Sequence, residues 1–202
     1  STITGGLLNT GYASNFAKLN LSSLAGGIAN TGSVGNYSFV TATSSTIQGG
    51  IQNAGSISGG TVPNINIKTS SVSGGIANLG MATFGGSGVT TGIYVSKSSI
   101  TGGILNSGTL YSSNTTLGFS AIKITASSVS GGLFNSGLLI QSTNSLSAIY
   151  GSASGIDWIN NSGTISSSTS YAAGKTLVGL NLISTSISQG ITNSGSIGGY
   201  TD

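Results

Sequence analysis

One short phrase, apolar-x-Gly-Gly-apolar-x-Asn-x-Gly-x-apolar, recurs eight times along this chain of 202 residues, with variations in the last two copies. It is clearest over residues 47–57, which read IQGGIQNAGSI. Successive motif asparagines are 21 to 32 residues apart. A repeat of this length is typical of a solenoid, in which each repeat forms one coil and buries its apolar face only against its neighbours. The phrase therefore predicts a stack of about eight coils. The motif asparagines are Asn9, Asn30, Asn53, Asn78, Asn106, Asn135, Asn161 and Asn193.

The segments that separate the phrases alternate between apolar and polar residues. Residues 65–72 read INIKTSSV, and residues 93–100 read IYVSKSSI. Alternation with a period of two indicates a β-strand with one buried face. The Ser-Ser pair that follows indicates a corner, because small hydroxyl side chains can bond their own backbone and turn the chain.

The phrase itself also keeps a period of two, but it is too long for one side of a coil. At about 3.3 Å per residue it would extend roughly 35 Å as a straight strand. We therefore expect a bend at Asn-x-Gly, since glycine permits a positive φ and asparagine tolerates it. This gives two or three strands per coil and one variable loop, which is short near residues 14–15 and long around residues 166–175.

These patterns together predict an all-β fold: a single-domain parallel β-helix, or β-solenoid, over residues 1–202, without helical caps. Right-handed coiling is expected, as for parallel crossovers in general. Stacking at about 4.8 Å per coil aligns equivalent residues. The apolar residues then form ladders inside, and the asparagines form a column at the bends that satisfies buried backbone. Lys18 and Lys123 share one position in this alignment, with Asn66 and Tyr94 between them.

The composition is unusually poor in charge. Charged residues are 3% of the chain, against about 25% in average globular domains. Such a surface offers little electrostatic resistance to self-association. The five lysines are scattered and arginine is absent, so nucleic acid is not expected as a partner. There is no apolar run of about 18 residues, so no membrane span is expected. The lack of cysteine fits a secreted chain.

Catalysis is not expected either. Glycoside cleavage requires two carboxylates or an assisted base, and the chain has only Asp157 and Asp202 with no histidine. Calcium-binding solenoid repeats carry an aspartate in every turn, which these coils do not. We therefore expect no enzyme activity, no cofactor and no metal site.

The seventh coil departs from the phrase, because Asp157-Trp158 replaces Gly-Gly. One interpretation is a local packing variant, since repeats near the end of a solenoid are often atypical. The other is a contact patch for a partner, since exposed tryptophan is enriched at binding hot spots.

Residues 50–57 (GIQNAGSI), residues 190–197 (GITNSGSI) and strands such as residues 121–124 (AIKI) resemble the Gly-Ile-x-Asn-Ser-Gly-x-Ile repeats of bacterial autotransporter passengers. The resemblance covers almost the whole chain. It implies a secreted parallel β-helix at the surface of a Gram-negative cell, with a role in adhesion or biofilm.

Two functions are compatible with these observations. The first is a structural subunit of an extracellular bacterial fibre, in which uncapped terminal coils stack head to tail and the chain is its own partner. The second is an adhesin segment of an autotransporter-like passenger that binds glycan or a host surface through its loops or through Tyr94, Tyr111, Tyr150 and Trp158. The residues expected at the stacking edges of the fibre are Ile3, Leu7, Leu8, Ile187, Ile191 and Ile197.

Overall fold

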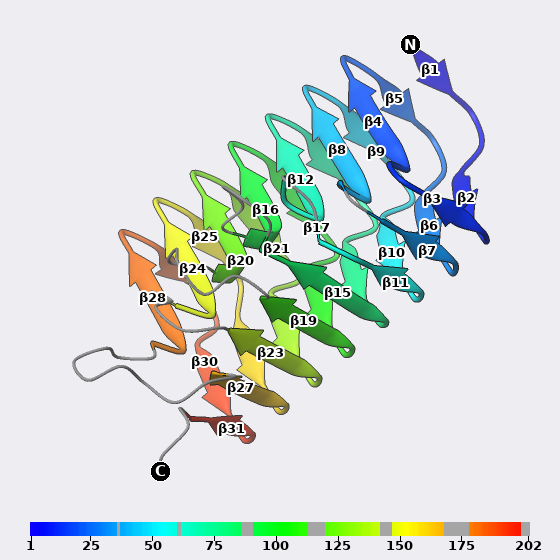
Figure 1. Ribbon diagram of the computed structural model, residues 1–202. Helices are drawn as coiled ribbons and strands as arrows, with labels where there is room; N and C mark the ends of the chain where they lie inside the picture. The colour runs from blue at the N-terminus through cyan, green and yellow to red at the C-terminus, as the bar shows by residue number, and fades with distance from the viewer. Residues whose placement is uncertain are drawn as a thin grey trace.

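The computed structural model is an elongated stack of β-coils that runs from the first strand to the last without folding back (Figure 1). It describes residues 1–35, 37–59, 62–85, 91–112, 120–141, 147–167 and 178–198. Every regular element in these ranges is a β-strand, and all strand pairs are parallel. No helix in the described residues has the length and apolar character needed to cross a membrane. The β-solenoid predicted from the sequence is thus confirmed.

Each complete coil contributes one strand to each of four sheets. Sheet A contains β1 (Thr2–Ile3), β5 (Ser23–Leu24), β9 (Thr46–Ile47), β13 (Ser71–Val72), β17 (Ser99–Thr101), β21 (Ser128–Ser130), β25 (Gly155–Ile156) and β29 (Ser186–Ile187). Sheet B contains β2 (Leu7–Asn9), β6 (Ile28–Asn30), β10 (Ile51–Asn53), β14 (Ile76–Asn78), β18 (Ile104–Asn106), β22 (Leu133–Asn135), β26 (Ile159–Asn161) and β30 (Ile191–Asn193).

The other two sheets hold the strands that follow the asparagines. Sheet C contains β3 (Tyr12–Ala13), β7 (Ser33–Val34), β11 (Ser56–Ile57), β15 (Met81–Phe84), β19 (Thr109–Ser112), β23 (Leu138–Gln141), β27 (Thr164–Ser167) and β31 (Ser196–Ile197). Sheet D contains β4 (Ala17–Asn20), β8 (Val40–Thr43), β12 (Ile65–Lys68), β16 (Thr91–Ser96), β20 (Ser120–Thr125), β24 (Ile149–Ser152) and β28 (Leu180–Ile183).

Four strands per coil correct the two or three expected from the sequence. The phrase bends twice, because the Gly-Gly pair separates sheet A from sheet B and the Asn-x-Gly turn separates sheet B from sheet C. The loops between sheets C and D vary in length, and residues 168–175 of the longest expected loop lie outside the described residues.

The glycines at the two bends serve different physical needs. At Gly-Gly, Gly50 and Gly75 have φ values of 79° and 76°, a conformation that a Cβ atom disfavours. At Asn-x-Gly the φ is ordinary, and the reason expected from the sequence was wrong there. Instead, a Cβ on Gly80 would lie 2.0 Å from the carbonyl oxygen of Gly55 one coil away. Only glycine allows the two backbones to approach so closely.

The corner between sheets D and A is formed by hydroxyl side chains, as the Ser-Ser pairs predict. The Ser70 hydroxyl donates to the Lys68 carbonyl at 2.7 Å and accepts the Ser45 backbone N–H at 3.0 Å. The residue before this hydroxyl residue, which is Thr185 in the last corner and serine in the others, has a positive φ near 50° in every corner, although it is never glycine. These strained residues are Leu21, Ser44, Thr69, Lys97, Ala126, Ala153 and Ser184.

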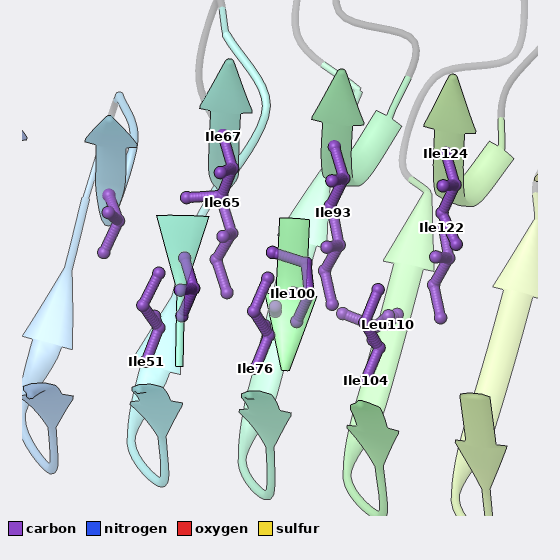
Figure 2. Close-up of a cluster of buried hydrophobic side chains, with 14 of the residues drawn as sticks. Ile51, Ile65, Ile67, Ile76, Ile93, Ile100, Ile104, Leu110, Ile122 and Ile124 are labelled. Atoms are coloured by element: carbon purple, nitrogen blue, oxygen red, sulfur yellow. The ribbon is translucent and has the colours of Figure 1, made fainter. Parts of the chain in front are cut away.

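The core is a set of apolar columns that run along the stack (Figure 2). Register places Ile51 beside Ile76, and Ile76 beside Ile104. Sheet D contributes two inward residues per strand, for example Ile65 and Ile67. Equivalent side chains of neighbouring coils therefore pack directly on one another, and each coil depends on its neighbours for burial.

Candidate functional site

The motif asparagines form one continuous column of hydrogen bonds. In each of the seven steps from Asn9 to Asn193, the Nδ2 of one asparagine donates to the Oδ1 of the next at 2.7–2.8 Å. Except at Asn53, the Nδ2 also donates to the carbonyl of the glycine two residues further along, as from Asn106 to Gly108 at 3.2 Å. The Nδ2 of Asn53 donates instead to the Met81 carbonyl in the next coil. The column satisfies the backbone at the bend, and it has a direction, because every amide donates toward the C-terminal end.

The two ends of the column are complementary. At the first coil, no asparagine of the described chain donates to the Oδ1 of Asn9. At the last described coil, Asn193 is exposed, and its Nδ2 donates only to the Gly195 carbonyl among the described residues. One end therefore presents an acceptor and the other presents a donor.

Five of the six residues expected at the stacking edges lie in inward-facing columns. Ile3 begins the column that ends at Ile187, and Leu7 begins the column that ends at Ile191. Ile197 ends a third column, which Ala13 begins. These residues are placed where a further coil would cover them.

Leu8 differs from the other five residues. Its register neighbours are Ala29 and then Gln52, on the outer face of sheet B, and its side chain is 62% exposed. Leu8 stands directly before the motif asparagine, and the third coil has glutamine at that position. A polar residue at this position was the sequence signal for a side chain that faces outward.

Exposure changes sharply at the last coil. Ile191 is 49% exposed, whereas Ile159 at the same position one coil earlier is 1% exposed. Ile197 is 41% exposed, and Ile165 below it is fully buried. The last coil thus presents an apolar face of the kind that stays buried elsewhere in the stack.

Asp157 and Trp158 lie at the corner between sheets A and B. A carboxylate oxygen of Asp157 accepts the Gly131 backbone N–H at 2.8 Å. The Trp158 ring lies against Gly132 and meets the ring of Phe134 edge to face, with centroids 6.3 Å apart. The space above Gly132 accommodates the indole, since a Cβ on that glycine would come within 2.4 Å of the ring. This geometry gives the pair a role in packing, and its service as a contact patch stays a prediction.

The outer face of sheet D carries tyrosines between lysines. The Lys68 ammonium lies 5.7 Å from the centroid of the Tyr94 ring, and the Lys123 ammonium lies 5.9 Å from the same ring. Lys123 also lies 5.4 Å from the ring of Tyr150 in the next coil. The shared position of Lys18, Asn66, Tyr94 and Lys123 that the sequence predicts is confirmed, with Thr41 in the same column. The Tyr94 ring lies near both the Lys68 and the Lys123 ammonium groups.

The phenol of Tyr94 responds to these neighbours. Burial alone would raise its pKa, but hydrogen bonds with the side chains of Ser96 and Thr125 and the charges of Lys123 and Lys68 together lower the pKa below its ordinary value. The charges of Lys68 and Lys123 thus favour the ionised form of the Tyr94 phenol.

The remaining aromatic residues of the adhesin hypothesis are not brought together. Tyr111 lies on sheet C, beside Thr83 and Ile140, and Trp158 lies at the corner between sheets A and B. Only Tyr94 and Tyr150 share a face.

The part of the chain that the structure describes contains no group of three histidine, cysteine, aspartate or glutamate side chains that could hold a metal ion. Asp202 lies outside the described residues, as does Lys175.

In comparisons with known proteins, no family model matches the chain, and no curated protein and no solved structure is similar to it. The fold alone defines its class, a β-helical repeat protein with a stacked asparagine column.

Proposed function

We propose that this solenoid is a structural subunit of an extracellular bacterial fibre, in which copies stack head to tail through their terminal coils. The observation that carries the proposal is the complementarity of the two end faces. A second copy would meet Asn193 Nδ2 with Asn9 Oδ1, and would repeat the bond made seven times inside the stack.

The strand arrangement supports the same contact. Within the described residues, the outer strands of sheets A, B and C have a strand neighbour on one side only. These strands are β1, β2 and β3 at one end and β29, β30 and β31 at the other. Exposed edges of this kind readily recruit further β-structure. The contact is heterologous, because one face meets a different face, and such contacts propagate into filaments.

Apolar contact adds to the backbone pairing. If a second copy stacks in register, its Ile3 lies on Ile187 of the first copy and its Leu7 lies on Ile191. Side chains that are partly exposed in the single molecule would then become buried. Burial of apolar surface contributes roughly 25 cal/mol per Å². A surface so poor in charge offers little repulsion against this approach.

We include secretion of the chain to the cell exterior in the same proposal. The repeats resemble those of autotransporter passengers, and the absence of cysteine is compatible with an oxidising exterior.

Electron microscopy of the purified 202-residue chain tests the proposal. We expect unbranched filaments that lengthen with protein concentration in the wild type. Ile191→Lys places a charge on the apolar end face and should leave monomers, because a buried unpaired ammonium is costly. Thr192→Lys is the matched control, since this neighbouring side chain is exposed on the outer face of the same strand. Monomeric wild-type protein at high concentration would overturn the proposal, as would equal loss of filaments in both variants.

A cell-surface adhesin segment is the second candidate. The observation that favours it is the array of lysines and tyrosines on the outer face of sheet D, which lies along the side of the stack.

A further inference from the structure

The described lysines are not scattered over the folded molecule. Lys18, Lys68 and Lys123 all project from the outer face of sheet D, and Lys97 lies at the corner directly after β16. The one aspartate in the described part of the chain, Asp157, lies at a different corner and contacts Gly131. Sheet D therefore presents a positive face without a compensating acid.

The three lysines occur on every second strand of the sheet. They belong to β4, β12 and β20, and β8 and β16 lie between them. At about 4.8 Å per coil, successive lysines are about 10 Å apart along the stack. Lys68 is displaced by two residues along its strand from the position that Lys18 and Lys123 share, so the three side chains form a staggered row. A ligand that matches this face must be extended and must carry a negative group at a similar interval.

The tyrosines restrict the positions of two of these ammonium groups. Lys68 and Lys123 approach the Tyr94 ring, and Lys123 also approaches Tyr150. Contacts of this kind are worth about 0.5–1 kcal/mol at exposed sites. Side chains that are already ordered lose less entropy when a ligand binds.

A hollow at the N-terminal end of the same face adds a polar group in need of a partner. A cavity of about 370 Å³ is lined by Phe16, Lys18, Tyr37, Thr41 and Asn66, among other residues. Asn66 is 7% exposed, and its buried Oδ1 has no hydrogen-bond partner among the described residues. A buried carbonyl oxygen of this kind is costly unless it meets a donor, and a sugar hydroxyl could supply that donor if the amide turns toward the hollow.

We propose that the outer face of sheet D binds an extended acidic polysaccharide, whose carboxylate or sulfate groups pair with Lys18, Lys68 and Lys123. Linear polysaccharides in an extended form direct equivalent groups to the same side on every second sugar, which suits a face with a cation on every second coil. The hydroxyls of Thr41, Thr125 and their neighbours line the remaining surface. This binding goes beyond the fibre function and does not depend on it, because the face lies along the side of the stack.

Single-stranded nucleic acid is the competing polyanion. The polysaccharide is favoured because arginine, the main reader of bases and phosphates, is absent from the chain. The Asn66 amide among the residues that line the hollow also suits sugar hydroxyls, which can both donate and accept.

Calorimetric titration with three polymers tests the proposal. Hyaluronan carries one carboxylate per disaccharide, dextran sulfate carries sulfates, and dextran is neutral. Titrations are carried out on the wild type and on Ile191→Lys, so that binding is measured whether or not filaments form. We expect salt-sensitive binding of hyaluronan or dextran sulfate and none of dextran. The better of the two anionic polymers identifies the charged group.

Lysine variants locate the binding surface. Lys68→Gln and Lys123→Gln should each weaken binding about two- to fivefold, and the triple variant that also contains Lys18→Gln should lose about tenfold or more. Lys97→Gln is the matched control, because it removes the same charge at the corner beside the face, and it should change affinity less than twofold. All four positions are on the surface, so circular dichroism should show an unchanged fold.

Several results would overturn the proposal. They are the absence of binding to both anionic polymers, equal binding of dextran, and a loss in Lys97→Gln as large as in Lys68→Gln. Tighter binding of single-stranded DNA than of either polysaccharide, lost in the same variants, would assign the face to nucleic acid instead.

Discussion

At the scale of single residues, the amide of each motif asparagine does two things at once. It bonds the next asparagine and it satisfies carbonyl groups at its own bend. Asn106, for instance, is fully buried, accepts from Asn78 and donates to Asn135, Gly108 and Leu138. No apolar residue of similar size can replace these bonds.

The first prediction concerns this buried amide. Asn106→Leu should lower the free energy of unfolding by about 2–4 kcal/mol, because it leaves buried groups of two neighbouring asparagines without a partner. Asn193→Leu, in the exposed last coil, should cost less than about 1 kcal/mol, since solvent can replace its bonds. Urea denaturation of the two variants measures the difference. Equal costs would contradict a structural role for the column.

At the scale of strands and corners, backbone approach decides which residues are allowed. The Asn-x-Gly bends stack so closely that the carbonyl oxygen of one coil occupies the space of a Cβ atom in the next. The corners between sheets D and A tolerate a strained φ at residues such as Thr69 and Lys97, because the following serine fixes the turn by two hydrogen bonds.

The second prediction compares two glycines at the same bend. Gly80→Ala should destabilise the protein by about 2 kcal/mol or more, since its Cβ would meet the Gly55 carbonyl and force the coils apart. Gly11→Ala lies in the first coil, where nothing comes within 4 Å of the added atom, and it should change stability by less than about 0.5 kcal/mol. Thermal unfolding of both variants would measure this, and a similar loss in each would show that conformation, not close approach, selects glycine here.

At the scale of the whole molecule, each coil contacts only the coils before and after it. Strands pair with their equivalents one coil away, and the order of every sheet follows the chain. Stability is then approximately a sum of coil and interface contributions. In the proposed fibre, the last coil of one molecule stacks on the first coil of the next through the same kind of interface.

The third prediction follows from this linear construction. Deletion of residues 46–70 removes one coil and joins Ser45 to Ser71, which takes the register position of Thr46. The shortened chain should fold with a similar circular dichroism spectrum and a modestly lower denaturation midpoint. Deletion of residues 46–56 removes only part of a coil, shifts every later column and should prevent cooperative folding. Equal behaviour of the two deletions would rule out a stack held by nearest-neighbour contacts.

The sequence by itself determined the architecture, because a periodic pattern of isoleucine, glycine and asparagine has one simple solution, in which equivalent residues stack. It therefore predicted the asparagine column, the serine corners and the alternation of Lys18, Asn66, Tyr94 and Lys123 along one line. These features depend only on the repeat length and on the period of two within each strand.

Only the tertiary structure decided how the coil closes. Four strands arise because the phrase bends at Gly-Gly as well as at Asn-x-Gly, and the reason for glycine at the second bend is contact with a neighbouring backbone, which sequence periodicity does not show. The outward position of Leu8 and the packing of Trp158 on Gly132 follow from the same local geometry. Lys68, which the sequence alignment did not group with Lys18, shares its outer face of sheet D, because stacking converts intervals between repeats into short distances along the axis of the coils.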